Sequence, residues 1–498
     1  MLFNSIDFLL FFPAVLIMYF ILPKRIKMYW LLIASYYFYM CWNAKYAILI
    51  LISTVITFFS GFCLEKSKLI DCDDKRRSVY RKSIVAVSLI SNLGILFGFK
   101  YLNFSIDLIN DLFSRFHVVL DIPNFDIILP VGISFYTFQA LSYTIDVYRG
   151  DISAERNFFK YALFVSFFPQ LVAGPIERSK NLLSQLNEPK RFNYENFREG
   201  ILLILWGYFL KIVLADRIAL FVDTVYGDIN SYPGVYLIIA TVLFAIQIYG
   251  DFAGYSTIAV GSAKILGIDL MENFKVPYFA ESVAAFWRNW HISLTSWFKD
   301  YLYIPLGGSR KGKARKYVNK MIVFLVSGLW HGANLTYVVW GGLNGLLQVI
   351  GEILQPLRDR AVCILKLNRE SLGHRLIKAF ATFTMVDVTW VFFRAKTMAE
   401  AIDVFKLSWG VHNPWVLFDG SLYECGLDIK NFRLVIVSVM ILLFADYCKL
   451  KGVAIRKVIL KQDWWFRILF FAAVTVMILL LGKWGPSFDK ANFIYFQF

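Results

Sequence analysis

The stretch "VFLVSGLWHGANLTYVVWGG" at residues 323–342 is almost wholly apolar, and this decides the class of fold. The same stretch nevertheless holds one ionisable side chain, His331. The chain has only five histidines among its 498 residues. Hydrophobic residues make up 58% of the chain, charged residues make up 18%, and the mean hydropathy is +0.56. The core of a water-soluble protein of this size does not require such a balance. The sequence therefore predicts an all-α polytopic membrane protein.

Apolar windows of about 17–20 residues recur from end to end and predict about twelve membrane-crossing helices. The first window follows no basic leader and precedes no small-residue cleavage site, so we interpret it as a retained span and not as a signal peptide. The predicted helices lie near residues 7–22, 28–42, 46–62, 84–101, 128–148, 199–222, 233–262, 318–333, 337–354, 379–394, 432–448 and 465–482.

The charge distribution predicts how the chain is oriented in the lipid bilayer. The net charge of +16 would suit a nucleic-acid partner, but basic residues of membrane proteins collect in cytoplasmic loops, so no nucleic acid is expected. With both termini on the extracytoplasmic side of the membrane, most basic residues fall in inward connections. The outward connections and termini then hold only seven of the 52, namely Lys45, Arg115, Lys396, Lys406, Lys430, Lys483 and Lys490.

Four connections stand out from the rest. Residues 157–180 and 283–308 lie on the predicted cytoplasmic side but are too apolar for ordinary loops, which predicts re-entrant segments around a cavity open to the cytoplasm. Two helices lying flat on the membrane surface would also explain them. Residues 103–127 and 396–431, on the outer side, show little helix pattern and are interpreted as long loops that either connect helices or dock a partner.

His331 is expected to lie deep in the membrane. Eleven helical steps, or about 17 Å, separate it from Lys320, which ends the basic run at the predicted cytoplasmic surface. An ionisable side chain at that depth costs several kcal/mol unless it is paired or solvated, so it is a candidate functional residue. A neutral imidazole hydrogen-bonded between helices is the structural alternative.

A second histidine, His291, lies in the second apolar segment, inside "FWRNWHISL". The two rings could line one passage, and imidazole is the side chain best suited to take a proton from a hydroxyl near neutral pH. A histidine among interfacial tryptophans is the alternative. Asp251 and Tyr255, in "YGDFAGYS", lie within another apolar run, and either Arg288 or a histidine is the expected partner of Asp251.

Other motifs give little support to alternative chemistry. The six cysteines have no CxxC spacing, so neither a metal site nor a disulfide framework is expected. Sequence signatures of soluble hydrolases and of nucleotide-binding loops do not occur. The basic, glycine-rich stretch "GGSRKG" at 307–312 is either a phosphate-binding loop or a solvated charged loop.

Several longer stretches carry a family resemblance over nearly the whole chain. They are "LPVGISFYTFQALSYTIDVYRG" (129–150), "FFPQLVAGPIER" (167–178), "DFAGYSTIAVG" (251–261), "NFKVPYFAESVAAFWRNWHISLTSWFKDYLYIPLGG" (273–308), "SGLWHGA" (327–333) and "FIYFQF" (493–498). Together they resemble the membrane-bound O-acyltransferase family, and more narrowly its bacterial branch typified by the alginate O-acetyltransferase membrane subunit.

The resemblance implies one membrane domain over residues 1–498, with N-terminal helices at 1–150, a catalytic core with re-entrant segments at 151–356 and C-terminal helices at 357–498. About eleven or twelve helices would surround a central tunnel. The resemblance also implies a catalytic histidine at His331 and a second polar site residue at His291. The residues expected to line or support the tunnel are Asp251, Tyr255, Arg288, Trp290, Trp330 and Asn334.

The activity that the resemblance implies is acyl transfer across the bilayer. Acetyl-coenzyme A would be a substrate and not a bound cofactor, with Arg310 and Lys313 available to its phosphates. A secreted or membrane-anchored acetyltransferase partner would pass the acetyl group to a polysaccharide. The closest alternative is D-alanyl transfer to teichoic acid from a carrier-protein thioester. A proton-coupled transporter is the alternative of another class, but the inverted repeats that it predicts are not visible.

Overall fold

The structure is a computed structural model that describes residues 1–69, 71, 73–118, 122–172, 174–188, 190–484 and 494. Every regular element in these residues is helical, which confirms the predicted all-α class. The chain divides into two compact units, Met1–Ile201 with Ala259–Met271 and Leu202–Ile258 with Glu272–Phe498. We describe each unit separately.

The first unit is built from helices of very different length. They are α1 (Ile6–Ile21), α2 (Lys24–Met40), η1 (Ala44–Tyr46), α3 (Ala47–Lys66), η2 (Ser67–Leu69), α4 (Asp74–Lys100), α5 (Leu102–Arg115), α6 (Ile133–Arg149), α7 (Phe158–Ser166), α8 (Phe168–Leu171) and α9 (Ser179–Gln185). Two more helices, α10 (Tyr194–Tyr208) and α12 (Val235–Ile265), begin in one unit and end in the other.

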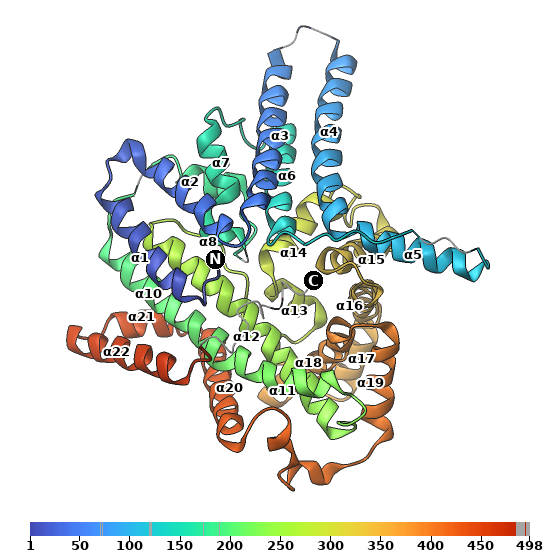
Figure 1. Cartoon of the computed structure of the whole chain (residues 1–498). Coiled ribbons are helices and arrows are strands. Elements are labelled where there is room, and N and C mark those ends of the chain that lie inside the picture. The colour runs from blue at the N-terminus through green and yellow to red at the C-terminus, as the bar shows by residue number, and fades with distance from the viewer. Residues whose placement is uncertain are drawn as a thin grey trace. The chain divides into compact units, whose positions relative to one another are not determined.

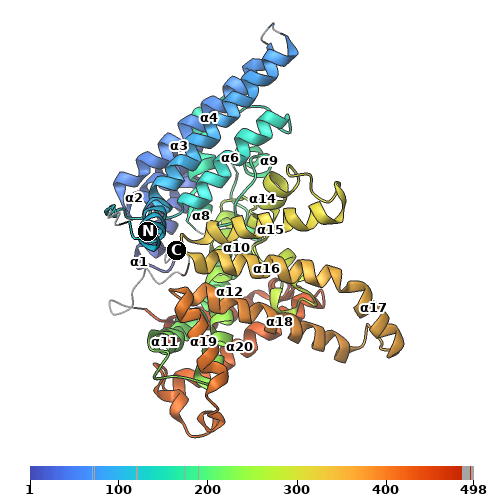
Figure 2. The ribbon, with the colours of Figure 1, turned by 90° about the vertical axis from the view of Figure 1, so that its right-hand side faces the viewer.

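Helices α3 and α4 run side by side in this unit (Figures 1 and 2). Their contact includes a buried hydrogen bond of 2.6 Å from Ser53 Oγ to Asn92 Oδ1. A third helix, α6, approaches α3 closely at Gly61, where an added Cβ would lie 2.6 Å from the ring of Tyr143. Small residues and buried hydrogen bonds of this kind hold helices together where lipid replaces water.

The predicted re-entrant segment at 157–180 is a broken helix. Helix α7 ends at Ser166, and α8 starts two residues later, because Phe167 departs from helical backbone, with φ −53° and ψ 110°. The break precedes Pro169, which occupies the first turn of α8 and is tolerated there. Every residue from Lys160 to Leu171 is buried, and this favours a segment enclosed by protein over a helix lying on the membrane surface.

The second unit holds the remaining helices. They are η3 (Phe209–Ala215, π-helical), α11 (Asp216–Gly227), η4 (Pro277–Phe279), α13 (Val283–Asn289), α14 (Ile292–Phe298), η5 (Lys299–Tyr303, π-helical), α15 (Gly312–His331), α16 (Leu335–Ile353), α17 (Gln355–Ile364), α18 (Leu372–Arg394), α19 (Met398–Gly410), η6 (Pro414–Leu417), η7 (Ser421–Glu424), α20 (Ile429–Leu450), α21 (Ile455–Leu460) and α22 (Trp464–Leu481).

Helices α15 and α16 form a tight antiparallel pair in the second unit (Figure 2). A Cβ added to Gly328 would lie 2.2 Å from the carbonyl oxygen of Tyr337, and one added to Gly341 would lie 2.2 Å from that of Phe324. Only glycine allows the two backbones to come this close. The pair places the C-terminal end of α15 against α16, and this end carries His331.

Each of the twelve predicted segments contains a helix, although residues 128–132 are not helical and the two outer segments were predicted wrongly. Residues 103–127 contain α5, and residues 396–431 contain α19, η6 and η7, where loops with little helix pattern were expected. Of the described helices, five are long and apolar enough to cross a membrane, or six if the pair α16 and α17, bent by 50°, counts as one span. The full number of crossings stays a prediction.

Candidate active site

His331 is the last residue of α15 and is 4% exposed. The helix ends there because Gly332 adopts extended backbone, with φ −164° and ψ 153°. Asn334 then starts α16, since its side chain accepts a hydrogen bond of 3.0 Å from the backbone N–H of Thr336. The imidazole therefore lies at a sharp turn between two tightly packed helices.

Aromatic rings pack around the His331 imidazole. The ring centroids of Trp330 and Trp340 each lie 5.0 Å from that of His331, and the centroid of Phe393 lies 5.4 Å from it. All three rings meet the imidazole edge to face. Trp340 in turn stacks on Trp390 at 5.6 Å. Close aromatic packing of this kind leaves little room for water beside the imidazole.

His291 lies at the break between α13 and α14 and is 1% exposed. Its backbone is left-handed, with φ 42°, which is uncommon for a residue other than glycine. The His291 ring packs edge to face on Phe252 of α12, with centroids 4.6 Å apart. Its Nδ1 lies 3.4 Å from Asn273 Oδ1 and 3.5 Å from Ser293 Oγ.

Trp330 connects the two histidines. Its ring centroid lies 5.0 Å from that of His331 and 6.0 Å from that of His291. Although forty residues separate the two histidines in the sequence, both rings therefore contact one indole. Trp330 was predicted only as a tunnel or support residue, and the structure gives it a specific place between the two candidate catalytic rings.

Trp290 belongs to the same aromatic cluster. It is 1% exposed, and its ring lies 5.2 Å from Trp390 and 5.3 Å from Phe286. Tyr255 is fully buried on α12, one helical turn after Asp251.

Asp251 has a different partner from those expected. Its Oδ1 lies 2.6 Å from Lys211 Nζ, and the same ammonium lies 2.7 Å from Asp216 Oδ1. Asp251 Oδ2 also accepts a hydrogen bond of 2.8 Å from the backbone N–H of Ile494. The expected pairing with Arg288 or a histidine was therefore wrong, and Arg288 is exposed at the end of α13.

Lys211 and Asp216 were not predicted as site residues, although the sequence carries a signal for them. Both lie in "FLKIVLAD", inside the apolar window predicted as the helix 199–222. A charged residue in such a window is a candidate for interior pairing, and this rule had identified Asp251. The closing stretch "FIYFQF" lies outside the described residues except for Ile494.

The structure does not place the remaining predicted site residues against either histidine ring. Asn334 has a local role as the cap of α16, and its Nδ2 donates to the carbonyl oxygen of Lys396 at 2.8 Å. Arg310 and Lys313 are exposed at the start of α15. Further along α15, Lys316 and Lys320 both pair with Glu352 of α16.

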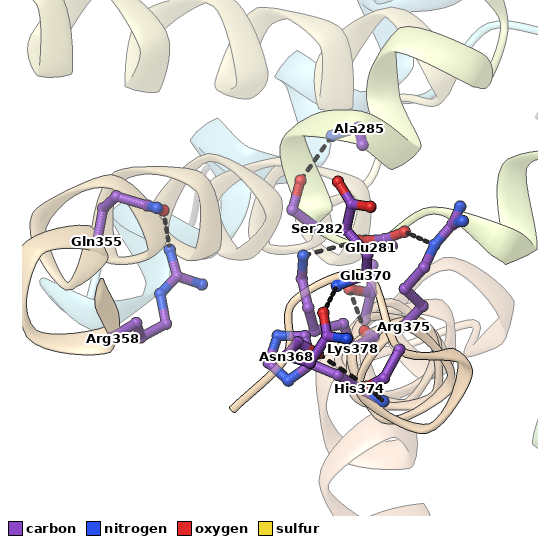
Figure 3. Close-up of polar contacts among 12 residues, drawn as sticks. Glu281, Ser282, Ala285, Gln355, Arg358, Asn368, Glu370, His374, Arg375 and Lys378 are labelled. Atoms are coloured by element: carbon purple, nitrogen blue, oxygen red, sulfur yellow. Dashed lines mark hydrogen bonds and ion pairs between the residues drawn. The ribbon is translucent and has the colours of Figure 1, made fainter. Parts of the chain in front are cut away.

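The segment that leads into α13 is tied to α18 by an ion-pair network (Figure 3). Glu281 accepts from Arg375 Nε and from Lys378 Nζ, each at 2.7 Å. The hydrogen bond from Lys378 is the largest of the causes that hold the pKa of the Glu281 carboxyl below its ordinary value. The next residue, Ser282, caps α13 by accepting from the N–H of Ala285. The network thus fixes where α13 begins, eight residues before the break at His291.

Comparison with known proteins identifies the family to which the chain belongs. The model of the membrane-bound O-acyltransferase family matches residues 152–384, a range that includes both histidines. The chain belongs to this family. A relative described in the next paragraph is identical to this chain at more than a third of the aligned residues, and the alignment covers most of both proteins. The chain is therefore a multi-pass membrane protein and an O-acyltransferase.

Three relatives narrow the comparison. The chain is similar to probable alginate O-acetylase AlgI of Pseudomonas putida, with 37% identity over 81% of this chain and 79% of that protein. It is also similar to peptidoglycan O-acetyltransferase of Helicobacter pylori, with 32% identity over 82% and 79%. Similarity to teichoic acid D-alanyltransferase of Bacillus subtilis is weaker, with 26% identity over 45% and 59%.

Proposed function

We propose that this protein moves an acetyl group from cytoplasmic acetyl-coenzyme A across the cell membrane for O-acetylation of an extracytoplasmic polysaccharide, with His331 as the catalytic base. The observation that carries the proposal is the convergence of His331 and His291, both buried, on the ring of Trp330. In an O-acyltransferase, a buried imidazole is the expected base for an acceptor hydroxyl.

The chemistry can be written around the His331 imidazole. A ring nitrogen takes the proton of the acceptor hydroxyl as the hydroxyl oxygen attacks the thioester carbonyl. The tetrahedral intermediate then collapses, the carbon–sulfur bond breaks, and the imidazolium returns the proton to the leaving thiolate. The aromatic rings of Trp330, Trp340 and Phe393 limit water at this point, which protects the thioester from hydrolysis. Direct transfer and a covalent acyl-histidine intermediate both fit this arrangement.

The donor is proposed to bind from the cytoplasmic side. Arg310 and Lys313 are exposed at the start of α15, whose other end carries His331. Their side chains are available to the phosphates of coenzyme A, while Lys316 and Lys320 are already paired with Glu352. The proposal requires a tunnel from this side to the histidines, wide enough for an acetyl thioester.

The acceptor is proposed from the relatives. Two of them are named for O-acetylation of alginate and of peptidoglycan. We therefore propose a polysaccharide acceptor on the extracytoplasmic side, reached through a secreted or membrane-anchored partner, and a location in the plasma membrane with both termini outside.

D-alanyl transfer to teichoic acid is a second candidate. It is favoured by two relatives named teichoic acid D-alanyltransferases, but their alignments cover only about half of this chain, with identities of 26% and 28%. Both candidates use a thioester donor, and they differ in what carries it.

A donor comparison tests the proposal. Membranes containing the protein receive acetyl-coenzyme A or a D-alanyl carrier-protein thioester, and release of the free thiol is measured. We expect release from acetyl-coenzyme A that is absent from membranes with the His331→Ala variant. Release from the carrier thioester alone would favour the second candidate, and equal release by wild type and His331→Ala would reject the proposed role of His331.

A further inference from the structure

The buried amide of Asn273 contacts the His291 ring. Asn273 is 2% exposed, and its Oδ1 accepts a hydrogen bond of 3.3 Å from the backbone N–H of Ser293 and lies 3.4 Å from His291 Nδ1. Its backbone carbonyl also accepts from the N–H of Ile292 at 2.9 Å. A single residue thus binds the backbone on the C-terminal side of His291 and contacts its ring.

These contacts hold His291 in a strained backbone conformation. His291 adopts φ 42°, and left-handed backbone costs an L-residue roughly 1–2 kcal/mol. Such a conformation persists where the surroundings over-determine it. The Asn273 amide fixes the first turn of α14 directly after the strained residue, so it holds the backbone that presents the ring.

The amide is itself anchored on α12. Its Nδ2 donates to Ser256 Oγ at 3.0 Å, and Ser256 is 3% exposed. Four residues earlier on the same helix, Phe252 packs against the His291 ring. Positions four apart lie on one face of a helix, so a single face of α12 positions both the ring and the amide that touches it.

The contact with Asn273 favours one position for the proton on the His291 ring. The backbone N–H of Ser293 can only donate, so the amide atom that faces it must be the oxygen, Oδ1. That oxygen also faces Nδ1 of His291 and can only accept. The arrangement therefore favours the neutral tautomer with hydrogen on Nδ1, in which Nε2 has the lone pair.

We propose that Asn273 is a positioning residue, which holds His291 at the site and selects the tautomer in which Nε2 can accept a hydrogen bond or a proton. This inference rests on the proposed function, in which His291 takes part in acyl transfer. It goes beyond that function because it assigns a role to Asn273 and to its anchor, Ser256.

The first test is the Asn273→Ala variant, measured as thiol release from acetyl-coenzyme A by membranes, with the His331→Ala rate subtracted. We expect kcat to fall about tenfold, the equivalent of one hydrogen bond, while KM for acetyl-coenzyme A stays near the wild-type value. The matched control is Asn413→Ala. Asn413 is also buried, but its amide binds the backbone of Val235 and Pro233 and no histidine, so its kcat should be close to wild type.

A double-mutant cycle separates positioning from general stability. Asn273→Ala is combined with His291→Gln, and we expect the double variant to be no slower than His291→Gln alone, because Asn273 acts through His291. Independent, multiplicative losses would show a purely structural role and overturn the inference, as would wild-type kcat in Asn273→Ala.

If Asn273→Ala does not accumulate in the membrane, a milder variant tests the same inference. Ser256→Ala removes only the anchor of the amide, and we expect a loss in kcat of about threefold at normal abundance. Unchanged kcat in Ser256→Ala would then overturn the inference. If the proposed function itself were wrong, the result would be different, because wild type and His331→Ala would release thiol equally.

Discussion

Buried ionisable side chains are the most informative residues in this protein, and each has a defined set of neighbours. His331 lies among aromatic rings, whereas His291 contacts an amide and a hydroxyl in addition to aromatic rings. The aromatic rings exclude water from His331, while the polar atoms beside His291 orient its ring. Under the proposed function, His331 exchanges a proton with the substrate and His291 presents a nitrogen in a fixed direction.

The buried cluster of Lys211, Asp216 and Asp251 predicts a large effect of a single substitution. Lys211→Met leaves two buried carboxylates without their shared ammonium, and removing one member of a buried ion pair costs about 3–5 kcal/mol. We expect a clear fall in the thermal midpoint in detergent and in membrane abundance. Adding Asp251→Asn should recover part of the loss.

The control for this prediction is Lys406→Met, which removes a lysine from an exposed pair with Asp403. Exposed pairs contribute little, so its thermal midpoint should match that of wild type. If Lys211→Met were equally harmless, the three charges would not form the interlocked cluster described above.

Some individual residues of the candidate active site could be predicted from the sequence. His331, His291 and Asp251 stood out because an ionisable residue is rare in an apolar window. Their partners could not be assigned, since pairing depends on which helix faces meet. Asn273 carried no such signal, because a single asparagine in a loop gives no sequence pattern.

At the scale of elements, the α15 and α16 pair predicts a steric test. Gly341→Val should force the two helices apart, because the added carbon would lie 2.2 Å from the carbonyl oxygen of Phe324. Overpacking of this kind costs about 1–3 kcal/mol. The matched control is Gly351→Val on the same helix, where an added Cβ meets nothing within 4 Å. Thermal midpoints in detergent should fall only for Gly341→Val, and equal midpoints would contradict the close packing.

The Glu281 network predicts a pH dependence (Figure 3). Because Lys378 and Arg375 hold its pKa below the ordinary value, Glu281 stabilises the fold above the ordinary carboxyl pKa of about 4.3, and this contribution is lost as pH falls through the lowered value. The thermal midpoint of wild type should exceed that of Glu281→Gln at neutral pH, and the difference should shrink below about pH 4.

The control for the pH dependence is Glu370→Gln, which neutralises an exposed carboxylate of the loop before α18. Its midpoint should follow that of wild type at every pH. A gap between wild type and Glu281→Gln that widened on acidification would contradict the prediction.

The elements were predicted well where they are long and apolar, and poorly where they are amphipathic. The apolar windows located twelve helices, because length and hydropathy alone reveal a span. Helix α5 was missed, although Leu108, Ile109, Leu112 and Phe113 follow the spacing of one helical face. Such a helix has a low average hydropathy, so a search for spanning windows passes over it.

For the whole molecule, the charge distribution predicts the sidedness of two exposed cysteines. Cys41 ends α2 at a predicted outer connection, and Cys363 lies on α17 in a predicted inner one. In variants that keep only one of these cysteines, a membrane-impermeant maleimide applied to intact spheroplasts should label Cys41 and not Cys363. Permeabilised cells should show labelling of both, and the reverse pattern in intact cells would invert the topology.

Membership of the O-acyltransferase family follows from motifs spread over most of the chain, so the class of enzyme could be predicted without coordinates. The tunnel, the donor and the partner implied by the resemblance stay predictions, because they depend on the space between helices and on molecules other than this chain. The structure adds the convergence of both histidines on Trp330.

The central claim is that acyl transfer depends on the His331 imidazole. The direct measurement is the acetyl content of the polysaccharide from cells whose own copy is replaced by His331→Ala, with His412→Ala, an exposed histidine, as control. At equal membrane abundance, we expect acetylation to fall at least about a hundredfold for His331→Ala and to stay at the wild-type level for His412→Ala. Wild-type acetylation by His331→Ala would contradict the claim.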